Sequence, residues 1–179
     1  MLSALSFLLL ANRLPAAEDL PAISQRAKSL MAEGRFKEAI PLYKQLVAAL
    51  PGNPGLLLNL GMAEHMAGDE RAAIPIFESV LKTQPKLLPA LLSLGAARLA
   101  LREPALAVAP LQKAVDADPA NPDARGMLAD ALNGAGQFDA AAAQYRKLTD
   151  LAPTTRASGT ASAWPTSRWQ PMPSNGSRS

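Results

Sequence analysis

The chain has 179 residues, of which 49% are hydrophobic but only 4% aromatic, and it contains no cysteine. Without cysteine there is no disulfide framework, no thiolate metal site and no cysteine nucleophile. The net charge of +3 comes from three arginines that follow Pro153, because the part before it holds 15 basic and 15 acidic residues. A neutral body with scattered charges lacks the basic patch that nucleic-acid binding requires, so we exclude nucleic acid as a partner.

The N-terminus carries a short apolar segment, Leu2 to Ala11, which the small residues Pro15 to Ala17 follow. This segment is too short to span a bilayer, which takes about 20 residues. Residues 1–17 therefore predict a cleavable signal peptide, and an exported protein of a bacterial periplasm or cell envelope. The alternative is an apolar helix that packs on the first unit of the array described next, in a cytoplasmic protein.

A period of 34 residues runs from residue 20 to residue 153. Prolines recur at positions 51, 85, 119 and 153, and alanines at 39, 73, 107 and 141. Larger apolar side chains keep the same spacing at Tyr43, Phe77, Leu111 and Tyr145, and small residues keep it at Ala27, Gly61, Gly95 and Ala129. Several columns that share one period predict an array of similar structural units.

Each unit has the pattern of two helices. In the second unit we expect a first helix from about Pro54 to Ala67 and a second helix from about Glu70 to Lys82. Gly61 lets the two helices approach closely, and Phe77 fills the space between units. Gly68 ends the first helix, because the left-handed conformation costs glycine little.

These columns resemble the tetratricopeptide repeat, a 34-residue helix-turn-helix with the pattern W-x2-L-G-x2-Y, then A-x3-F, then P. The second unit supplies Leu57, Leu60-Gly61, Ala73, Phe77 and Pro85. The resemblance implies an all-α fold, a right-handed α-solenoid of antiparallel helix pairs. We expect four repeats, at residues 20–53, 54–87, 88–121 and 122–153.

Two features depart from the family pattern. The tyrosine column holds Glu64 and Arg98 in the middle units, and we expect these two side chains to form a partly buried ion pair across neighbouring first helices. Pro41, Pro75 and Pro110 are expected early in the second helices, where a missing N–H costs less than in a helix interior.

The resemblance also implies a function, since members of the family hold segments of partner proteins on a concave surface lined by the first helices. The inner positions predict a largely apolar groove made of Lys28, Leu58, Asn59, Met62, His65, Met66, Leu92, Ala96 and Leu99. Methionine side chains adapt to varied apolar partners. Pro89 and Ser93 occupy positions where some members carry the basic residues that bind chaperone C-termini, which disfavours that kind of partner.

Met62, His65 and Met66 share one helix face at spacings i, i+3 and i+4, so a Cu(I) site is an alternative interpretation of this face. No second cluster of such residues accompanies them, and we expect no metal and no other cofactor. With one histidine, and without a nucleophile elbow, a P-loop or a dinucleotide fingerprint, the sequence favours a binding protein over an enzyme.

Residues 154–179 break the period and are rich in Ser, Pro, Thr and Arg, which predicts a disordered tail. Both tryptophans, Trp164 and Trp169, appear where a fifth repeat is due. When the implied codons are read one base earlier they can spell W-x2-L-G-x2-Y, so we expect a frameshifted remnant of a fifth repeat, with a native tail as the alternative. The last helix would then lack a cover, which predicts self-association through residues 138–150.

Overall fold

The computed structural model describes residues 19–151, so the predictions for residues 1–17 and for the tail lie outside the described part. Within residues 19–151 there are eight helices and no strands, which confirms the all-α prediction. The helices are α1 Leu20–Ala32, α2 Phe36–Ala49, α3 Pro54–Met66, α4 Glu70–Thr83, α5 Leu88–Ala100, α6 Pro104–Ala117, α7 Pro122–Gly134 and α8 Phe138–Leu151.

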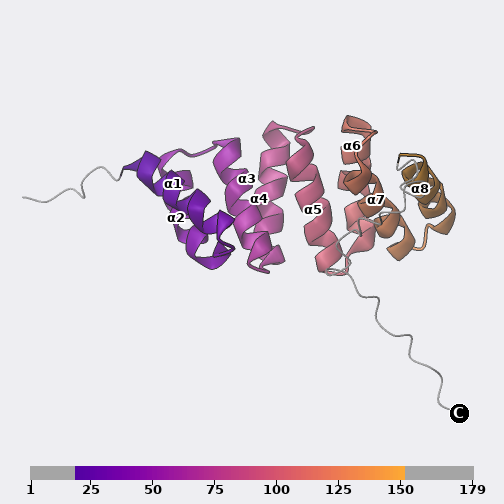
Figure 1. Cartoon of the computed structure of the whole chain (residues 1–179), viewed down its shortest axis with the longest axis horizontal. Coiled ribbons are helices and arrows are strands. Elements are labelled where there is room, and N and C mark those ends of the chain that lie inside the picture. Colours follow the sequence, from indigo (N-terminus) through magenta and orange to yellow (C-terminus); the bar gives the residue numbers. More distant parts are fainter. Residues whose placement is uncertain (1–18, 152–179) are drawn as a thin grey trace, which may run out of the picture.

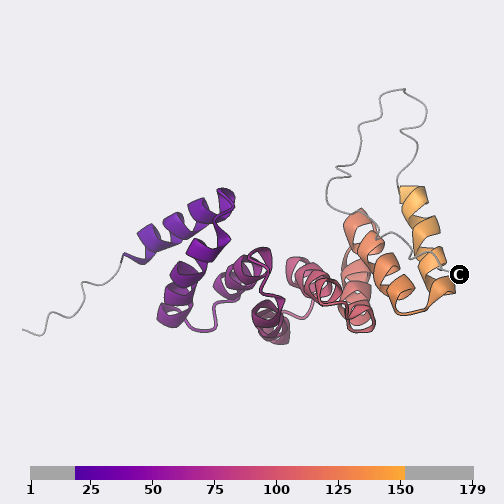
Figure 2. The same ribbon diagram turned by 90° about the horizontal axis from the view of Figure 1, so that it is seen from below.

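The helices form four antiparallel pairs that stand side by side in a row (Figure 1). Each helix packs against the helices before and after it in the chain, and α3 also contacts α5, as α5 contacts α7. The first helices of the pairs therefore lie closer to one another than the second helices do. Figure 2 shows that the row is bent, and the contacts place the first helices on its shorter, inner side.

The helix starts follow from local capping chemistry. The side chains of Asn53, Asp69 and Asn121 accept hydrogen bonds from backbone N–H groups in the first turns of α3, α4 and α7. These groups have no partner inside the helix, so a side-chain acceptor stabilises the helix end. Proline at the first helical position of α3, α6 and α7 loses no hydrogen bond there.

The helices of each pair approach closely at the column of small residues. A Cβ atom at Gly61 would lie 2.6 Å from Cε1 of Phe77, and a Cβ atom at Gly95 would collide with Leu111 in the same way. On its other side Phe77 shares a core cluster with Leu94 and Ala97 of α5. Phe77 is therefore buried between its own unit and the next one, as the sequence predicted.

The prolines of the second helices lie deeper than predicted. Pro41 and Pro75 are the sixth residues of α2 and α4, and Pro110 is the seventh residue of α6. The ladder of backbone hydrogen bonds has already begun at that depth, since Ala73 N–H donates to Asp69 O two residues before Pro75. The expectation of an early, inexpensive position is thus wrong, and each proline removes one hydrogen bond from a helix interior.

The turns inside the four pairs share one backbone conformation. Gly34, Gly68 and Gly136 have φ of 74°, 86° and 78°, and Arg102 stands at the matching position of the third pair with φ of 61°. The prediction for Gly68 is confirmed. Arg102 adopts the left-handed region although its Cβ atom is unfavourable there.

We therefore expect Arg102→Gly to raise the free energy of unfolding by about 0.5–1 kcal/mol, because glycine adopts this conformation without the Cβ penalty but loses more chain entropy. Urea denaturation followed by circular dichroism measures the change. Gly68→Ala is the matched control and should lower stability by a similar amount. Equal stability of the arginine and glycine proteins would show that the turn carries no strain.

No helix within residues 19–151 has both the length and the hydropathy needed to cross a bilayer.

Candidate functional site

The nine residues of the predicted groove lie on three first helices. Lys28 is on α1, while α3 carries Leu58, Asn59, Met62, His65 and Met66, and α5 carries Leu92, Ala96 and Leu99. Because α3 contacts α5, eight of the nine come from adjacent helices on the inner side of the row. Lys28 and Met66 are exposed and the other seven are half-buried. Their role in binding stays a prediction.

The apolar groove residues also support the core. Leu58 and Met62 pack against the cluster that contains Phe77 and Leu94. Leu92 and Leu99 pack in the same way against the cluster around Leu111. Each of these side chains is therefore held in place by the core while part of its surface stays open to solvent.

Asn59 brings a polar group to this apolar surface. Its side chain is half-buried, and within residues 19–151 it neither bonds to another residue nor buries an unsatisfied atom. A free amide can donate to and accept from an extended peptide backbone. The surface thus offers apolar contacts together with one hydrogen-bonding group.

His65 is engaged with its own helix pair. Its Nδ1 lies 2.5 Å from Oε2 of Glu70, which joins the end of α3 to the start of α4. Nε2 is then the ring nitrogen open to another ligand. In the described part of the chain no three His, Cys, Asp or Glu side chains gather around a common point. The copper hypothesis, which uses Met62 and Met66 with His65, stays a prediction.

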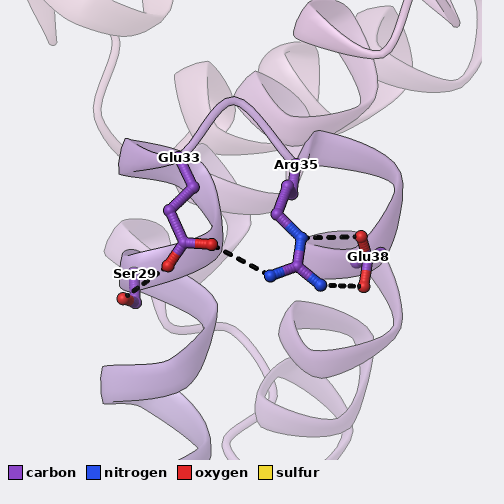
Figure 3. A network of polar contacts seen from close by, with 4 residues as sticks. All are labelled: Ser29, Glu33, Arg35 and Glu38. Carbon is purple, nitrogen blue, oxygen red and sulfur yellow. Dashed lines mark hydrogen bonds and ion pairs between the residues drawn. The ribbon is translucent and has the colours of Figure 1, made fainter.

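A second concave feature, which the sequence did not reveal, lies between the first two pairs. A cavity of about 320 Å³ is lined by residues 34–38 of the α1–α2 turn and by Met66 and Ala67 at the end of α3. Arg35 is fixed beside it by hydrogen bonds of 2.8 and 2.7 Å to the two carboxylate oxygens of Glu38 and of 2.9 Å to Glu33, as Figure 3 shows. These bonds hold the pKa of Glu33 and Glu38 below their usual range. In the sequence, the close spacing of Glu33, Arg35 and Glu38 was the signal that could have indicated this cluster of ion pairs.

The expected ion pair between Glu64 and Arg98 is wrong. Glu64 instead forms an ion pair with Lys44 on α2 at 2.9 Å, and Arg98 donates to Glu78 on α4 at 2.9 Å and to Glu103 at 2.7 Å. Both residues thus face the second helix of the preceding pair, 20 positions earlier in the chain. One salt bridge, Lys44–Glu64, therefore joins the first pair to the second, and another, Glu78–Arg98, joins the second pair to the third. The acidic residue is on the first helix in the former and on the second helix in the latter.

We expect Glu64→Lys to lower the free energy of unfolding by about 1–3 kcal/mol, because the Glu64 side chain is only 7% exposed and would face Lys44 as a like charge. The double change Lys44→Glu with Glu64→Lys should recover at least half of the loss in urea denaturation. The double change Glu64→Lys with Arg98→Glu should recover nothing. Recovery by this second pair alone would contradict the observed pairing.

The last pair differs from the others in its polar contacts. Arg125 is buried, with Nη1 bonded to Gln144 at 2.8 Å, Nη2 bonded to the carbonyl of Pro119, and Nε without a partner in the described residues. Tyr145 donates to Asp130 at 2.6 Å, and burial together with this bond raises the pKa of Tyr145 to about 12. Polar side chains thus hold α8 where the earlier pairs rely more on apolar contacts.

The family model described as Tetratricopeptide repeat matches residues 30–97 and again residues 98–162, together more than half of the chain. The chain is 31% identical over 134 residues to the Cellulose synthase 2 operon protein C of Komagataeibacter xylinus. The aligned region covers 73% of this chain and 10% of that protein. The chain is also 32% identical over 81 residues to the Protein CTR9 homolog of Arabidopsis thaliana. The aligned region covers 45% of this chain and 7% of that protein. The chain thus spans a tenth or less of these two relatives.

Among solved structures, MamA from Desulfovibrio magneticus RS-1, beginning at its residue 41, is similar to this chain with a TM-score of 0.72 and 26% sequence identity. The similarity covers 76% of this chain and 77% of the other. It extends over nearly the whole described array, so the stacked helix pairs have a close counterpart in an experimental structure.

Proposed function

Because the chain belongs to the tetratricopeptide repeat family, we propose that it is a non-catalytic interaction scaffold that holds an apolar segment of a partner protein on its inner surface. The observation that carries this proposal is the set of half-buried apolar side chains on α3 and α5, with the free amide of Asn59 among them. A groove of this kind suits a segment that inserts apolar side chains and bonds to Asn59 through its backbone.

Rigidity of the groove supports the proposal. Leu58, Met62, Leu92 and Leu99 are anchored on the core clusters and therefore lose little side-chain freedom when a partner binds. A preformed surface reduces the ordering cost of association, so modest apolar burial gives useful affinity. The more exposed Met66 and Lys28 lie at the margins of this surface, where adaptable contacts are sufficient.

The relatives support an interaction module in general but do not identify the partner. Each of the two curated relatives is a much longer protein, of which this chain matches a tenth or less. Their names therefore say nothing specific about the segment that this chain binds, and we propose only the chemistry of that segment.

We expect the protein to enrich apolar sequences from a displayed library of short peptides, and Met62→Glu to weaken binding of the enriched peptides at least about tenfold, since it places a charge on the apolar surface. Fluorescence anisotropy with the selected peptides measures the affinity. Leu106→Glu is the matched control, because Leu106 is 56% exposed on the second helix α6. Equal weakening by both changes, or no effect of either, would refute the groove.

We also propose that residues 1–17 are removed during export. The outer face of α1 is polar or small, with Ala22, Arg26 and Ser29 all exposed. The matching positions of α3 are Leu56, Leu60 and Ala63, which pack in one cluster with residues of α2. The outer face of α1 therefore offers no apolar stripe that a cap helix would cover, which favours the signal peptide over that alternative.

N-terminal sequencing of the protein from a bacterial envelope fraction tests the export proposal. We expect the mature chain to begin close to Glu18, directly after the small residues Pro15 to Ala17. An exported protein that retains Met1, or a protein found only in the cytoplasm, would contradict it.

A further inference from the structure

The outer face of α8 is open where the earlier second helices are covered. Tyr43, Phe77 and Leu111 occupy the same position in the first three pairs and are 2%, 0% and 0% exposed, while Tyr145 is 39% exposed. Phe138, at the start of α8, is 66% exposed. Ala142 and Thr149, which continue the same stripe at spacings of four residues from Phe138 and Tyr145, are exposed as well.

This face repeats the face of α2, which is covered by α3. Five residues of the two helices correspond at a separation of 102 positions, namely Phe36 with Phe138, Ala39 with Ala141, Tyr43 with Tyr145, Lys44 with Arg146, and Leu46 with Leu148. Ala141 is buried against α7, and we call the other four residues of α8, Phe138, Tyr145, Arg146 and Leu148, the end face. No other second helix in the described array carries both the aromatic residues and the basic residue at these positions.

The cover of α2 shows what the end face fits. Leu60 and Ala63 of α3 share a core cluster with Tyr43 and Leu46, and Leu56 packs against that cluster. Glu64 completes the contact through an ion pair with Lys44 at 2.9 Å. The covering helix therefore presents apolar residues at i, i+4 and i+7 and a carboxylate at i+8.

We propose that the end face is a docking site for one amphipathic helix of a partner protein that carries the pattern of α3, with apolar residues at i, i+4 and i+7 and Asp or Glu at i+8. The apolar residues cover Tyr145 and Leu148, and the acidic residue pairs with Arg146. Arg146 is exposed and forms no salt bridge with any residue from 19 to 151, so it is free for this contact.

The residues that follow α8, 152–179, contain no Asp or Glu side chain that could pair with Arg146. In a head-to-tail contact between two copies, α1 would bring Arg26 and Ser29 to the places that Leu60 and Ala63 hold in α3. Such a contact would bury a guanidinium group beside Arg146, so charge complementarity disfavours a second copy in this arrangement.

Two helices of the chain serve as probes that differ in the deciding charge. Residues 54–67 contain the pattern of α3, with Glu64 as the acidic residue. Residues 88–101 have apolar residues at the same three positions but carry Arg98 in place of the acid. Each segment is fused to the same soluble fluorescent carrier and titrated against the full chain. We expect the Glu64 probe to bind about fivefold more tightly than the Arg98 probe at low salt, and Arg146→Glu to reverse this order.

Variants of the full chain separate docking on the end face from binding elsewhere. Phe138→Asp should weaken both probes at least about tenfold, because it places a charge at the end of the apolar contact that the docked helix would cover. Leu106→Asp, at an exposed leucine outside the end face, should leave both affinities unchanged. Circular dichroism confirms that each variant keeps its helices.

Three results would overturn the proposal. The first is equal binding of the two probes with no response to Arg146→Glu. The second is a change in tryptophan emission of the full chain on Phe138→Asp, since both tryptophans lie at 164 and 169 and would then report that the chain covers its own end face. The third is a concentration-dependent dimer in light scattering that Phe138→Asp dissociates, which would assign the face to a second copy.

Discussion

The structure depends on one repeated contact, in which a large side chain in the middle of a second helix is enclosed between its own first helix and the first helix of the next pair. Phe77 shows both halves of this contact, since it lies against Gly61 on one side and against Leu94 and Ala97 on the other. Complete burial of such a side chain stabilises the fold by roughly 1.5–3 kcal/mol. No pair can achieve this alone, so the stability of each pair depends on its neighbours.

The same contact explains how the two ends differ. The outer face of α1 is polar, with Arg26 and Ser29 where α3 has Leu60 and Ala63, so it offers little apolar surface to a neighbouring helix. The outer face of α8 keeps the aromatic residues of a covered helix, and Tyr145 remains 39% exposed. Within residues 19–151 the array thus has a polar end and an apolar end, and a further helix would bury more apolar surface at the apolar end.

The repeating part of the fold could be predicted from the sequence because it is set by local and translational rules. Gly68 was identified as a helix end from its chemistry alone, and its φ of 86° follows from that role. Gly61 and Phe77 could be assigned to a helix crossing because the 34-residue period places the same pair of residue sizes in the next unit, as Gly95 and Leu111. For the groove, the resemblance to the tetratricopeptide repeat indicated that the first helices line the inner side.

Contacts between long charged side chains could not be predicted, because they depend on the helix crossing and not on the period. Glu64 and Arg98 are 34 positions apart, yet each pairs with a residue 20 positions earlier on the preceding second helix. The engagement of His65 with Glu70 was missed for a similar reason. The left-handed conformation of Arg102 could have been predicted, because the 34-residue period places it at the position of Gly34, Gly68 and Gly136. The Nε of Arg125, which has no partner among residues 19–151, is buried at a position where the other units carry Ile or Leu.

Native-state hydrogen exchange, followed residue by residue, tests most directly whether burial between neighbouring pairs stabilises the array. We expect the amides of α4 and α6, which are covered on both sides, to exchange with the highest free energy of opening, and those of α8 with a value lower by at least about 1 kcal/mol. If α8 were as strongly protected as α4 in the isolated monomer, the stability of a second helix would not depend on the following first helix, and the central claim would be contradicted.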